Sequence, residues 1–339
     1  MSRRFVNLMV DRRIGRYRHP ATTLHRINPW RCFHPTTQQA LAAALTENSN
    51  GVTVEDARHI LLRSPPGGNH RRDALRLPRQ QQSNGVISMD PDGNTFLYDG
   101  ASRGLRVMPA LHSPKHSSVF LTVGDGLYIL EKNPGTEEDH SFEALIHRAP
   151  SDGIWTTKNT RRRCYERNGR DPYVIRAYTV VGDSQSQIWI STRDGGTSFD
   201  TTSGVWSEAG DWALPFYGRV EYAPELGLWF GFTSEGRQFA ACDLGAASPT
   251  SPPALRKVWD ELAQPLLLPL GGGKFCVARM FHLAQKGWCR GKSIDDYLDV
   301  DTFVVLTGVE VVRGSRGALR MIRHKSRPYC VGCTTAQLL

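Results

Sequence analysis

The sequence predicts an all-β protein built from short antiparallel strands. Short segments rich in aromatic and β-branched residues recur from about residue 85 onward, as expected for strands. Turn signals such as Pro91-Asp92-Gly93 and Gly124-Asp125-Gly126 separate these segments and favour hairpins. The chain has 339 residues, of which 40% are hydrophobic, and all-β architectures of this length often form one domain with a full core.

The N-terminal quarter is expected to begin with a hairpin whose strands cover residues 5–10 and 23–27. Residues 38–48 are rich in Ala and Leu, which predicts a short helix with Thr36 or Thr37 as its N-cap. A further strand is predicted at 59–62. Residues 64–85 are rich in Pro, Gly, Gln and Arg, so we expect a long exposed loop there.

From residue 85 the predicted strands follow one another in sets. The expected segments are 86–89, 95–98 and 105–108; then 119–123, 127–130, 142–146 and 154–156; then 174–181, 238–242 and 257–259; and finally 275–278, 302–306, 309–312 and 319–322.

One stretch, from Gln187 to Phe232, is especially rich in strand and turn signals. It predicts strands at 188–191, 197–200 and 205–207, followed by one that starts near 219, breaks at Pro224 and resumes at 228–230. We expect these strands to form one antiparallel sheet. With no helix to cover it, such a sheet needs neighbours of the same kind, as the blades of a β-propeller do.

The spacing of three tryptophans supports a repeating architecture. Trp155, Trp206 and Trp259 each follow Ile or Val in a predicted strand, about 50 residues apart, the period of a Kelch-type blade. An aromatic residue on an outer strand would pack between neighbouring sheets. We therefore predict a Kelch-like β-propeller of six blades, within a range of five to seven. The N-terminal hairpin can supply one blade by pairing with C-terminal strands.

Five segments of the chain carry a resemblance to known proteins: FVNLMV, TLHRI, GTSFDTTSGVWSEAGDWALPF, ELGLWFGF and TFVVLTGVEVVRGSRGALRMIRHKS. In these segments the chain resembles a large plant family, expanded in grasses, of Kelch-like β-propeller proteins of unknown function. Residues 211–216 are the most specific piece. Arginine-rich insertions at 11–18 and 63–79 depart from the pattern. The resemblance implies a fold and brings no catalytic residues.

We expect a single domain in three sections. Residues 1–84 contribute strands, the short helix and an Arg-rich loop to ring closure, residues 85–325 form the propeller blades, and residues 326–339 form a C-terminal tail.

The net charge of +9 belongs to the first quarter of the chain. Residues 1–84 hold 14 arginines and five acidic residues, a balance of 14 − 5 = +9, whereas the remainder holds 28 basic and 28 acidic side chains. Three interpretations stay open: a mitochondrial targeting signal, a phosphate-binding surface for nucleic acid, and solvated loops beside edge strands. The candidate targeting residues are Arg3, Arg4, Arg12, Arg13, Arg16 and Arg18.

Candidate binding residues lie in two arginine clusters. Arg71 and Arg72 belong to the predicted long loop. Arg161, Arg162 and Arg163 form the basic cluster of the body, which could bind an acidic partner, act as a nuclear import signal, or belong to an exposed loop between blades.

Three motifs suggest chemistry only superficially. Thr192–Phe199 has the Asp-box spacing of sialidase-like propellers, which is a structural hairpin. Gly271–Lys274 lacks the spacing and the following helix of a phosphate-binding loop, so we expect a hairpin turn. Cys330 and Cys333 form a lone CxxC for which Cys289, His282 and His324 offer no matching spacing.

The expected function is therefore a non-enzymatic, protein-binding scaffold that uses loops on one propeller face. Alternatives are an enzyme or small-molecule binder acting at the central channel, and a mitochondrion-directed regulator. No catalytic residue, metal or cofactor is predicted. Seven scattered cysteines fit a reducing compartment, so we expect a cytoplasmic or nuclear protein. Neither a membrane span nor nucleic-acid binding is expected, and the sequence leaves the protein partner and the oligomeric state open.

Overall fold

The computed structural model describes most of the chain in fifteen segments. These are residues 5–12, 21–46, 59–63, 73–76, 85–90, 92–100, 102–133, 141–148, 154–159, 174–182, 186–193, 195–263, 266–284, 300–332 and 334–338. The chain divides into two compact units. The first comprises Met1–His70 and Gln264–Leu339, and the second comprises Arg71–Ala263.

The first unit contains both helical turns, one α-helix and eight strands among its described residues. They are β1 (Val6–Arg12), β2 (Ala21–Ile27), η1 (Pro29–Cys32), α1 (Thr37–Thr46), β3 (His59–Arg63), β20 (Leu266–Gly271), β21 (Lys274–Ala284), β22 (Val300–Arg313), η2 (Ser315–Gly317), β23 (Leu319–Gly332) and β24 (Thr334–Leu338).

The second unit consists of strands and turns where it is described. Its strands are β4 (Asp73–Arg76), β5 (Val86–Met89), β6 (Thr95–Asp99), β7 (Gly104–Met108), β8 (Ser118–Val123), β9 (Gly126–Glu131), β10 (Phe142–Arg148), β11 (Ile154–Asn159), β12 (Ala177–Val181), β13 (Gln187–Ser191), β14 (Gly196–Asp200), β15 (Val205–Gly210), β16 (Phe216–Ala223), β17 (Leu228–Thr233), β18 (Gln238–Cys242) and β19 (Leu255–Ala263).

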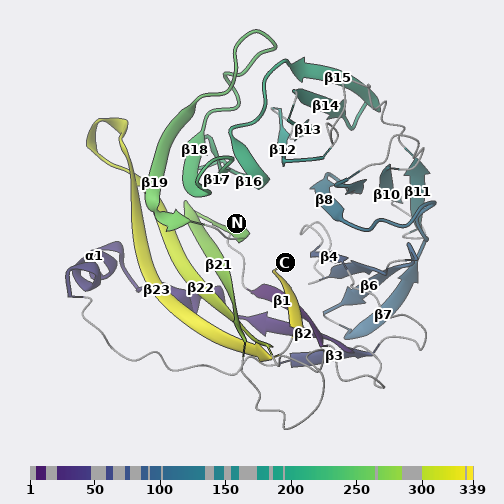
Figure 1. Ribbon diagram of the computed structural model, residues 1–339, viewed down its shortest axis with the longest axis horizontal. Coiled ribbons are helices and arrows are strands. Elements are labelled where there is room, and N and C mark those ends of the chain that lie inside the picture. The colour runs from purple at the N-terminus through teal and green to yellow at the C-terminus, as the bar shows by residue number, and fades with distance from the viewer. Residues whose placement is uncertain are drawn as a thin grey trace, which may run out of the picture. The chain divides into compact units, whose positions relative to one another are not determined.

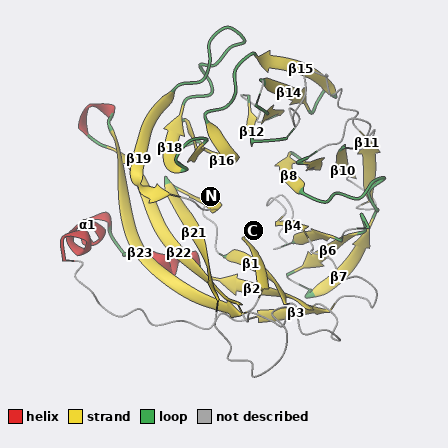
Figure 2. Cartoon of the chain, in the orientation of Figure 1, coloured by secondary structure: helices red, strands yellow, loops and turns green. Residues whose placement is uncertain are grey.

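The all-β prediction is confirmed, and so is the short N-terminal helix (Figure 2). Helix α1 begins after Thr36, whose hydroxyl accepts a hydrogen bond from the Gln39 backbone N–H at 3.2 Å. Thr36 is therefore the N-cap, because its side chain satisfies one of the backbone donors that a helix start leaves free. Within the described residues, the strands form four sheets of four strands and one sheet of eight.

The sheets of the second unit pack face to face in chain order (Figure 1). Met89 of the β4–β7 sheet meets Leu127 of the β8–β11 sheet in one apolar cluster. Phe142 of β10 then contacts Phe199 of β14, with ring centroids 4.9 Å apart in an edge-to-face arrangement. Each sheet thus buries apolar side chains against the next, which removes the need for covering helices.

Two of the three periodic tryptophans can be followed to their contacts. The ring centroid of Trp206 on β15 lies 5.1 Å from that of Phe142 in the preceding sheet, so Trp206 packs between sheets as predicted. Trp259 on β19 is buried and stacks on Phe239 at 5.2 Å. Trp155 lies on β11, outside the residues whose side chains are described. All three strands are the fourth and last of a set, which explains the spacing.

The expectation that Gln187 to Phe232 forms one antiparallel sheet is wrong. Strands β12 to β15 form one set of four, and β16 begins the next set, β16 to β19. The two sets join through a parallel pair, in which Ala177 of β12 faces Gly218 of β16. Residues 211–215 cross from the edge strand β15 back to β12, so a parallel neighbour follows a run of hairpins.

The Arg-rich loop is likewise not wholly irregular. Residues 73–76 form β4, which pairs with β5 and completes a set where sequence predicted three strands. Backbone pairing of a short segment with an existing strand decides its structure here, in spite of flanking Pro and Gln residues.

Both ends of the chain meet in one sheet of the first unit, with strand order β24-β1-β2-β3. The predicted pairing of the N-terminal hairpin with a C-terminal strand is confirmed, since Met9 of β1 faces Gln337 of β24. The expected tail at 326–339 is therefore wrong where it is described: residues up to 332 continue β23 and 334–338 form β24. Backbone hydrogen bonds to β1 make residues 334–338 a strand, although their side chains show little of the apolar–polar alternation typical of strands.

A buried polar cluster ties residues 33–37 to the β20–β23 sheet of the same unit. Glu310 on β22 forms an ion pair with Lys274 and accepts a hydrogen bond from Thr37 Oγ1 at 3.1 Å. Its other neighbour is His324 Nε2 at 3.1 Å, while His324 Nδ1 accepts from the His34 backbone N–H at 3.2 Å. This arrangement requires a neutral His324 with its proton on Nε2.

The same segment approaches β22 closely at Gly308. A Cβ atom placed on Gly308 would lie 2.4 Å from the Cys32 carbonyl oxygen, well inside van der Waals contact. Only glycine leaves room for η1 against the sheet, because the obstructing atom belongs to the backbone.

Candidate binding site at one end of the second unit

Two backbone hydrogen bonds link three sets of strands of the second unit at one end, namely β8–β11, β12–β15 and β16–β19. The Ile175 N–H donates to the Lys132 carbonyl at 2.9 Å, and the Gly218 N–H donates to the Arg176 carbonyl at 2.6 Å. Lys132 follows β9, Arg176 precedes β12, and Gly218 lies near the start of β16. We call the end where β8, β12 and β16 begin the basic end of the second unit.

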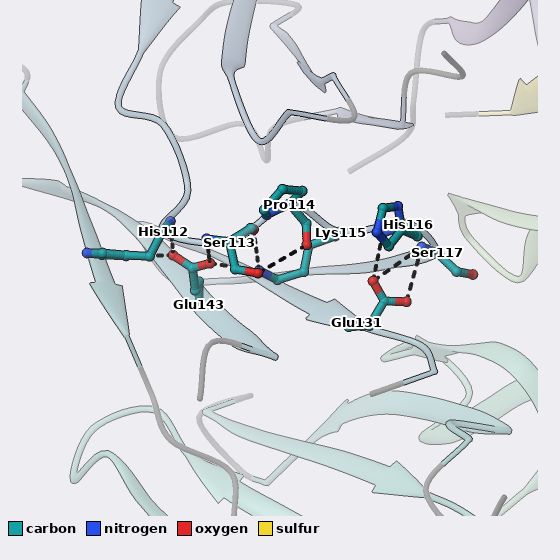
Figure 3. A network of polar contacts seen from close by, with 8 residues as sticks. All are labelled: His112, Ser113, Pro114, Lys115, His116, Ser117, Glu131 and Glu143. Carbon is teal, nitrogen blue, oxygen red and sulfur yellow. Dashed lines mark hydrogen bonds and ion pairs between the residues drawn. The ribbon is translucent and has the colours of Figure 1, made fainter. Parts of the chain in front are cut away.

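A short strap, residues 112–117, crosses this end before β8 begins (Figure 3). Its outer part rests on Glu143 of β10, whose side chain is fully buried. The Glu143 carboxylate accepts from the His112 N–H at 2.8 Å, from His112 Nδ1 at 2.7 Å and from the Ser113 N–H at 3.2 Å. Lys115 Nζ completes the set at 2.7 Å and is itself 1% exposed. The strap is thereby fixed by a buried ion pair.

The inner part of the strap is held by a second carboxylate, Glu131 of β9 (Figure 3). Glu131 accepts from the backbone N–H groups of His116 at 2.7 Å and Ser117 at 3.1 Å. The Asn133 N–H donates to it at 3.3 Å. Since both carboxylates are occupied by donors from the strap and its surroundings, they serve to position the residues around them.

The charged state of Glu143 is favoured by its partners. Burial alone would raise the pKa of this carboxyl, but hydrogen bonds from Lys115 and His112, and the Lys115 charge, outweigh burial and lower its pKa below the ordinary value. An anion is therefore stable at this buried position at neutral pH, which keeps the ion pair intact.

Beside the strap, Lys132 and Arg237 converge on Tyr217 at the start of β16. We call these three residues the Tyr217 cluster. Lys132 Nζ lies 3.4 Å from the Tyr217 hydroxyl and 5.2 Å from the ring centroid. Arg237 Cζ lies 3.1 Å from the same centroid, so its guanidinium stacks on the ring. Tyr217 remains 39% exposed, which leaves the cluster open to solvent.

The backbone of Arg237 takes up a conformation that most residues avoid. It lies in the turn between β17 and β18 with φ of +53°, in the left-handed region that glycine favours. A side chain there costs on the order of 1 kcal/mol. The stacking of Arg237 on Tyr217 offsets part of this cost.

The positive charges act on the tyrosine itself. Burial tends to raise the pKa of Tyr217, but the charge and hydrogen bond of Lys132, with a smaller contribution from Arg237, lower it below its ordinary value. The hydroxyl is therefore a better hydrogen-bond donor than that of an isolated tyrosine.

One further cation, Arg176, belongs to the same end of the unit. Arg176 is exposed and forms no ion pair with a described carboxylate, and neither do Lys132 and Arg237. The exposed His116 lies on the strap above Glu131. Within the described part of the chain, the basic end thus presents to solvent three cations without an ion-pair partner and one aromatic ring.

The arginines singled out from the sequence lie almost entirely outside the described residues. This holds for the targeting candidates Arg3, Arg4, Arg13, Arg16 and Arg18 and for the binding candidates Arg71, Arg72, Arg161, Arg162 and Arg163. Arg12 is the last residue of β1, where its backbone pairs with Ala21 and Thr334. These side chains are not among those described, so their binding and targeting roles stay predictions.

Two of the motifs that the sequence analysis assigned to hairpins form hairpin turns where they are described. Thr192 and Gly195 close the β13–β14 hairpin, with the Thr192 N–H donating to the Gly195 carbonyl at 3.0 Å. Gly272 and Gly273 form the β20–β21 turn, and Gly271 ends β20. Among the described residues, no group of His, Cys, Asp and Glu side chains could hold a metal ion. His324 is engaged with Glu310.

The most specific piece of the sequence resemblance, residues 211–216, is the connection from β15 to β16. Trp212 packs against Trp189 at 5.5 Å and donates from Nε1 to the Ser248 carbonyl at 2.8 Å. The Leu214 N–H donates to Ser191 Oγ at 2.9 Å. The motif therefore fixes the crossing between two sets of strands and places Tyr217 directly after it.

Sequence reasoning missed the Tyr217 cluster altogether. Its members are far apart in the chain and none belongs to a charge run, so composition gave no signal. The positions at which strands begin and end could have pointed to it, because Lys132 and Tyr217 each flank a predicted strand or turn.

The fold and this site define an all-β protein with a basic, aromatic surface at one end of its second unit. The chain belongs to the family described as "Protein of unknown function (DUF1668)", which matches residues 3–330. A comparison with curated proteins found no match. Among the residues that the structure describes, no helix is long and apolar enough to cross a membrane.

One similar solved structure is an auxiliary nutrient binding protein from Bacteroides thetaiotaomicron. The sequence identity is 6% and the TM-score is 0.39. The match covers 70% of this chain and 54% of that protein, so the chain spans about half the length of the structure it matches. A similarity at this level identifies neither a ligand nor an activity.

Proposed function

We propose that this protein is a non-enzymatic interaction protein, built on a Kelch-like β-propeller of six blades, that binds an acidic segment of a partner protein. The observation that carries the binding proposal is the convergence of Lys132 and Arg237 on the exposed Tyr217, with Arg176 close by in the backbone network. Arginine and tyrosine are enriched in protein interfaces, and uncompensated cations steer acidic partners.

The propeller itself is supported by the grouping of strands. The described strands fall into six sets of four: β24-β1-β2-β3, β4–β7, β8–β11, β12–β15, β16–β19 and β20–β23. Neighbouring sets within the second unit pack through apolar clusters, as blades do. In the first set, the last strand of the chain, β24, pairs with the first, β1. Propellers commonly close their ring in this way, with one blade built from both ends of the chain.

A binding role fits the chemistry of this end better than catalysis does. An enzyme that processes glycans would need a carboxylate free to exchange protons. Glu143 and Glu131 are instead occupied by donors from the strap, and Lys115 is paired with Glu143. What the basic end offers to a ligand is positive charge, hydrogen-bond donors and an aromatic face.

The proposal is tested with a Glu-rich peptide and a matched Gln peptide, titrated into the full chain at low and at high salt. We expect the Glu peptide alone to bind, with an affinity that falls as salt screens the charges. The triple variant Lys132→Gln, Arg176→Gln, Arg237→Gln should lose this binding. Equal binding of the two peptides, or undiminished binding by the triple variant, would contradict the proposal.

A further inference from the structure

We infer that the Tyr217 cluster is a phosphoryl-binding site that prefers a phosphate monoester dianion to a carboxylate. This inference rests on the proposed function, since it specifies which anion on a partner the basic end selects. It concerns three residues, Lys132, Tyr217 and Arg237, from three different parts of the second unit.

The first reason is the charge balance of the cluster. Lys132 and Arg237 bring two positive charges to one tyrosine, and neither forms an ion pair with a described carboxylate. A carboxylate ligand would neutralise one of these charges, whereas a phosphate monoester carries close to two negative charges at neutral pH. The dianion therefore matches the cluster and leaves less unpaired charge behind.

The second reason is the number and type of donors. The Lys132 ammonium has three N–H donors, of which the Tyr217 hydroxyl at 3.4 Å occupies at most one. The Arg237 guanidinium presents several N–H groups in a fixed planar fork that suits the oxygens of a phosphate. A tetrahedral group with three terminal oxygens can use donors from both side chains and from the hydroxyl, while a carboxylate has two oxygens.

The third reason is that the cluster is held in place before any ligand arrives. The Lys132 N–H donates to the Ser117 carbonyl at 2.7 Å, and its carbonyl accepts from Ile175. Tyr217 is followed by Gly218, whose N–H is bonded to Arg176. The buried Lys115–Glu143 pair fixes the strap next to Lys132. Binding therefore orders few further groups, which favours affinity.

Arg237 also offers a variant that separates binding from folding. Because its φ is +53°, Arg237→Gly relieves the backbone while removing the guanidinium. Arg103 in the β6–β7 turn, with φ of +56°, has the same residue type and conformation but lies outside the cluster. Arg103→Gly is therefore the matched control.

The experiment compares three peptides of one sequence that carry phosphoserine, glutamate or serine at the central position, each titrated calorimetrically into the full chain. We expect the phosphoserine peptide to bind at least about tenfold more tightly than the glutamate peptide, since the second negative charge adds a charge-assisted contact. Arg237→Gly and Tyr217→Phe should each reduce phosphopeptide affinity by about tenfold. Arg103→Gly should leave it unchanged.

Inorganic phosphate and sulfate serve as competitors that identify the source of the phosphoryl group. Weak competition indicates a phosphorylated protein segment, and competition as strong as the phosphopeptide indicates a small phosphorylated molecule. Equal affinity for the phosphoserine and glutamate peptides would overturn this inference and leave the proposed function standing. If neither the phosphoserine peptide nor the glutamate peptide binds, this inference and the proposed function are both overturned. An equal loss of phosphopeptide affinity in Arg103→Gly and Arg237→Gly would also overturn both.

Discussion

The buried ion pair beneath the strap allows a sharp prediction about stability. Lys115→Met keeps most of the side-chain volume but removes the ammonium that lies 2.7 Å from the Glu143 carboxylate. The two side chains are 1% and 0% exposed, so solvent cannot replace the lost partner. Breaking a buried pair from one side costs about 3–5 kcal/mol, because it leaves an uncompensated charge.

The remaining hydrogen bonds set where the variant falls within that range. Glu143 keeps three donors, the backbone N–H groups of His112 and Ser113 and the His112 ring. These still stabilise the anion, so we expect a loss near the lower limit, about 3 kcal/mol. Lys132→Met, the same substitution at a partly exposed lysine nearby, should cost less than about 1 kcal/mol.

The measurement is chemical denaturation of both variants across a range of pH. Because the pKa of Glu143 is lowered in the folded protein, its contribution is present above the pKa of the unfolded chain, about 4.3, and is lost as the pH falls. Lys115→Met should flatten this acid dependence. Equal free energies of unfolding for wild type and Lys115→Met at pH 7 would mean that the Lys115–Glu143 ion pair does not stabilise the fold.

Three further predictions concern the first unit. Gly308→Ala should destabilise the fold by about 1–3 kcal/mol in urea denaturation, because the new methyl group meets the Cys32 carbonyl, whereas Gly314→Ala, where the nearest atom is 3.5 Å away, should be tolerated. Burial lowers the pKa of His324 in the folded protein. The unfolded chain is therefore protonated first, so the free energy of unfolding of the wild type should fall as the pH drops below about 6.5. His324→Gln should show a shallower fall. Thr36→Ala should cost about 1 kcal/mol through loss of the N-cap, and an unchanged denaturation midpoint would exclude the cap's contribution.

Much of the fold could be predicted from the sequence because its signals are local. Alternating apolar residues and Gly-containing turns located most strands, and Ala-rich residues after Thr36 located the helix. The spacing of Trp206 and Trp259 indicated the period, since a tryptophan recurs on the last strand of three successive sets, on β11, β15 and β19. These features depend on residues that are close in the chain.

The errors arose where distant pairing decides the structure. Residues 73–76 and 334–338 have weak strand patterns, and backbone bonds to β5 and β1 make them strands. The parallel contact of β12 with β16 cannot be inferred from hairpin signals, so the division of the 187–232 stretch was misplaced.

The candidate site was not predictable for the same reason. Charge runs drew attention to the arginines, whereas the cluster combines three isolated residues whose proximity follows from sheet packing. Tyr217 directly follows the connection at 211–216 in the chain, but its partners Lys132 and Arg237 come from other turns.

Amide hydrogen exchange of the full chain, with and without saturating Glu-rich peptide, locates the surface that binds an acidic partner. We predict that protection on binding is concentrated at the basic end, in residues 131–133, 175–177, 216–219 and 234–238. Protection instead at the opposite ends of the same strands, in the turns at 124–126 and 224–227, would show that the acidic partner does not bind at the basic end.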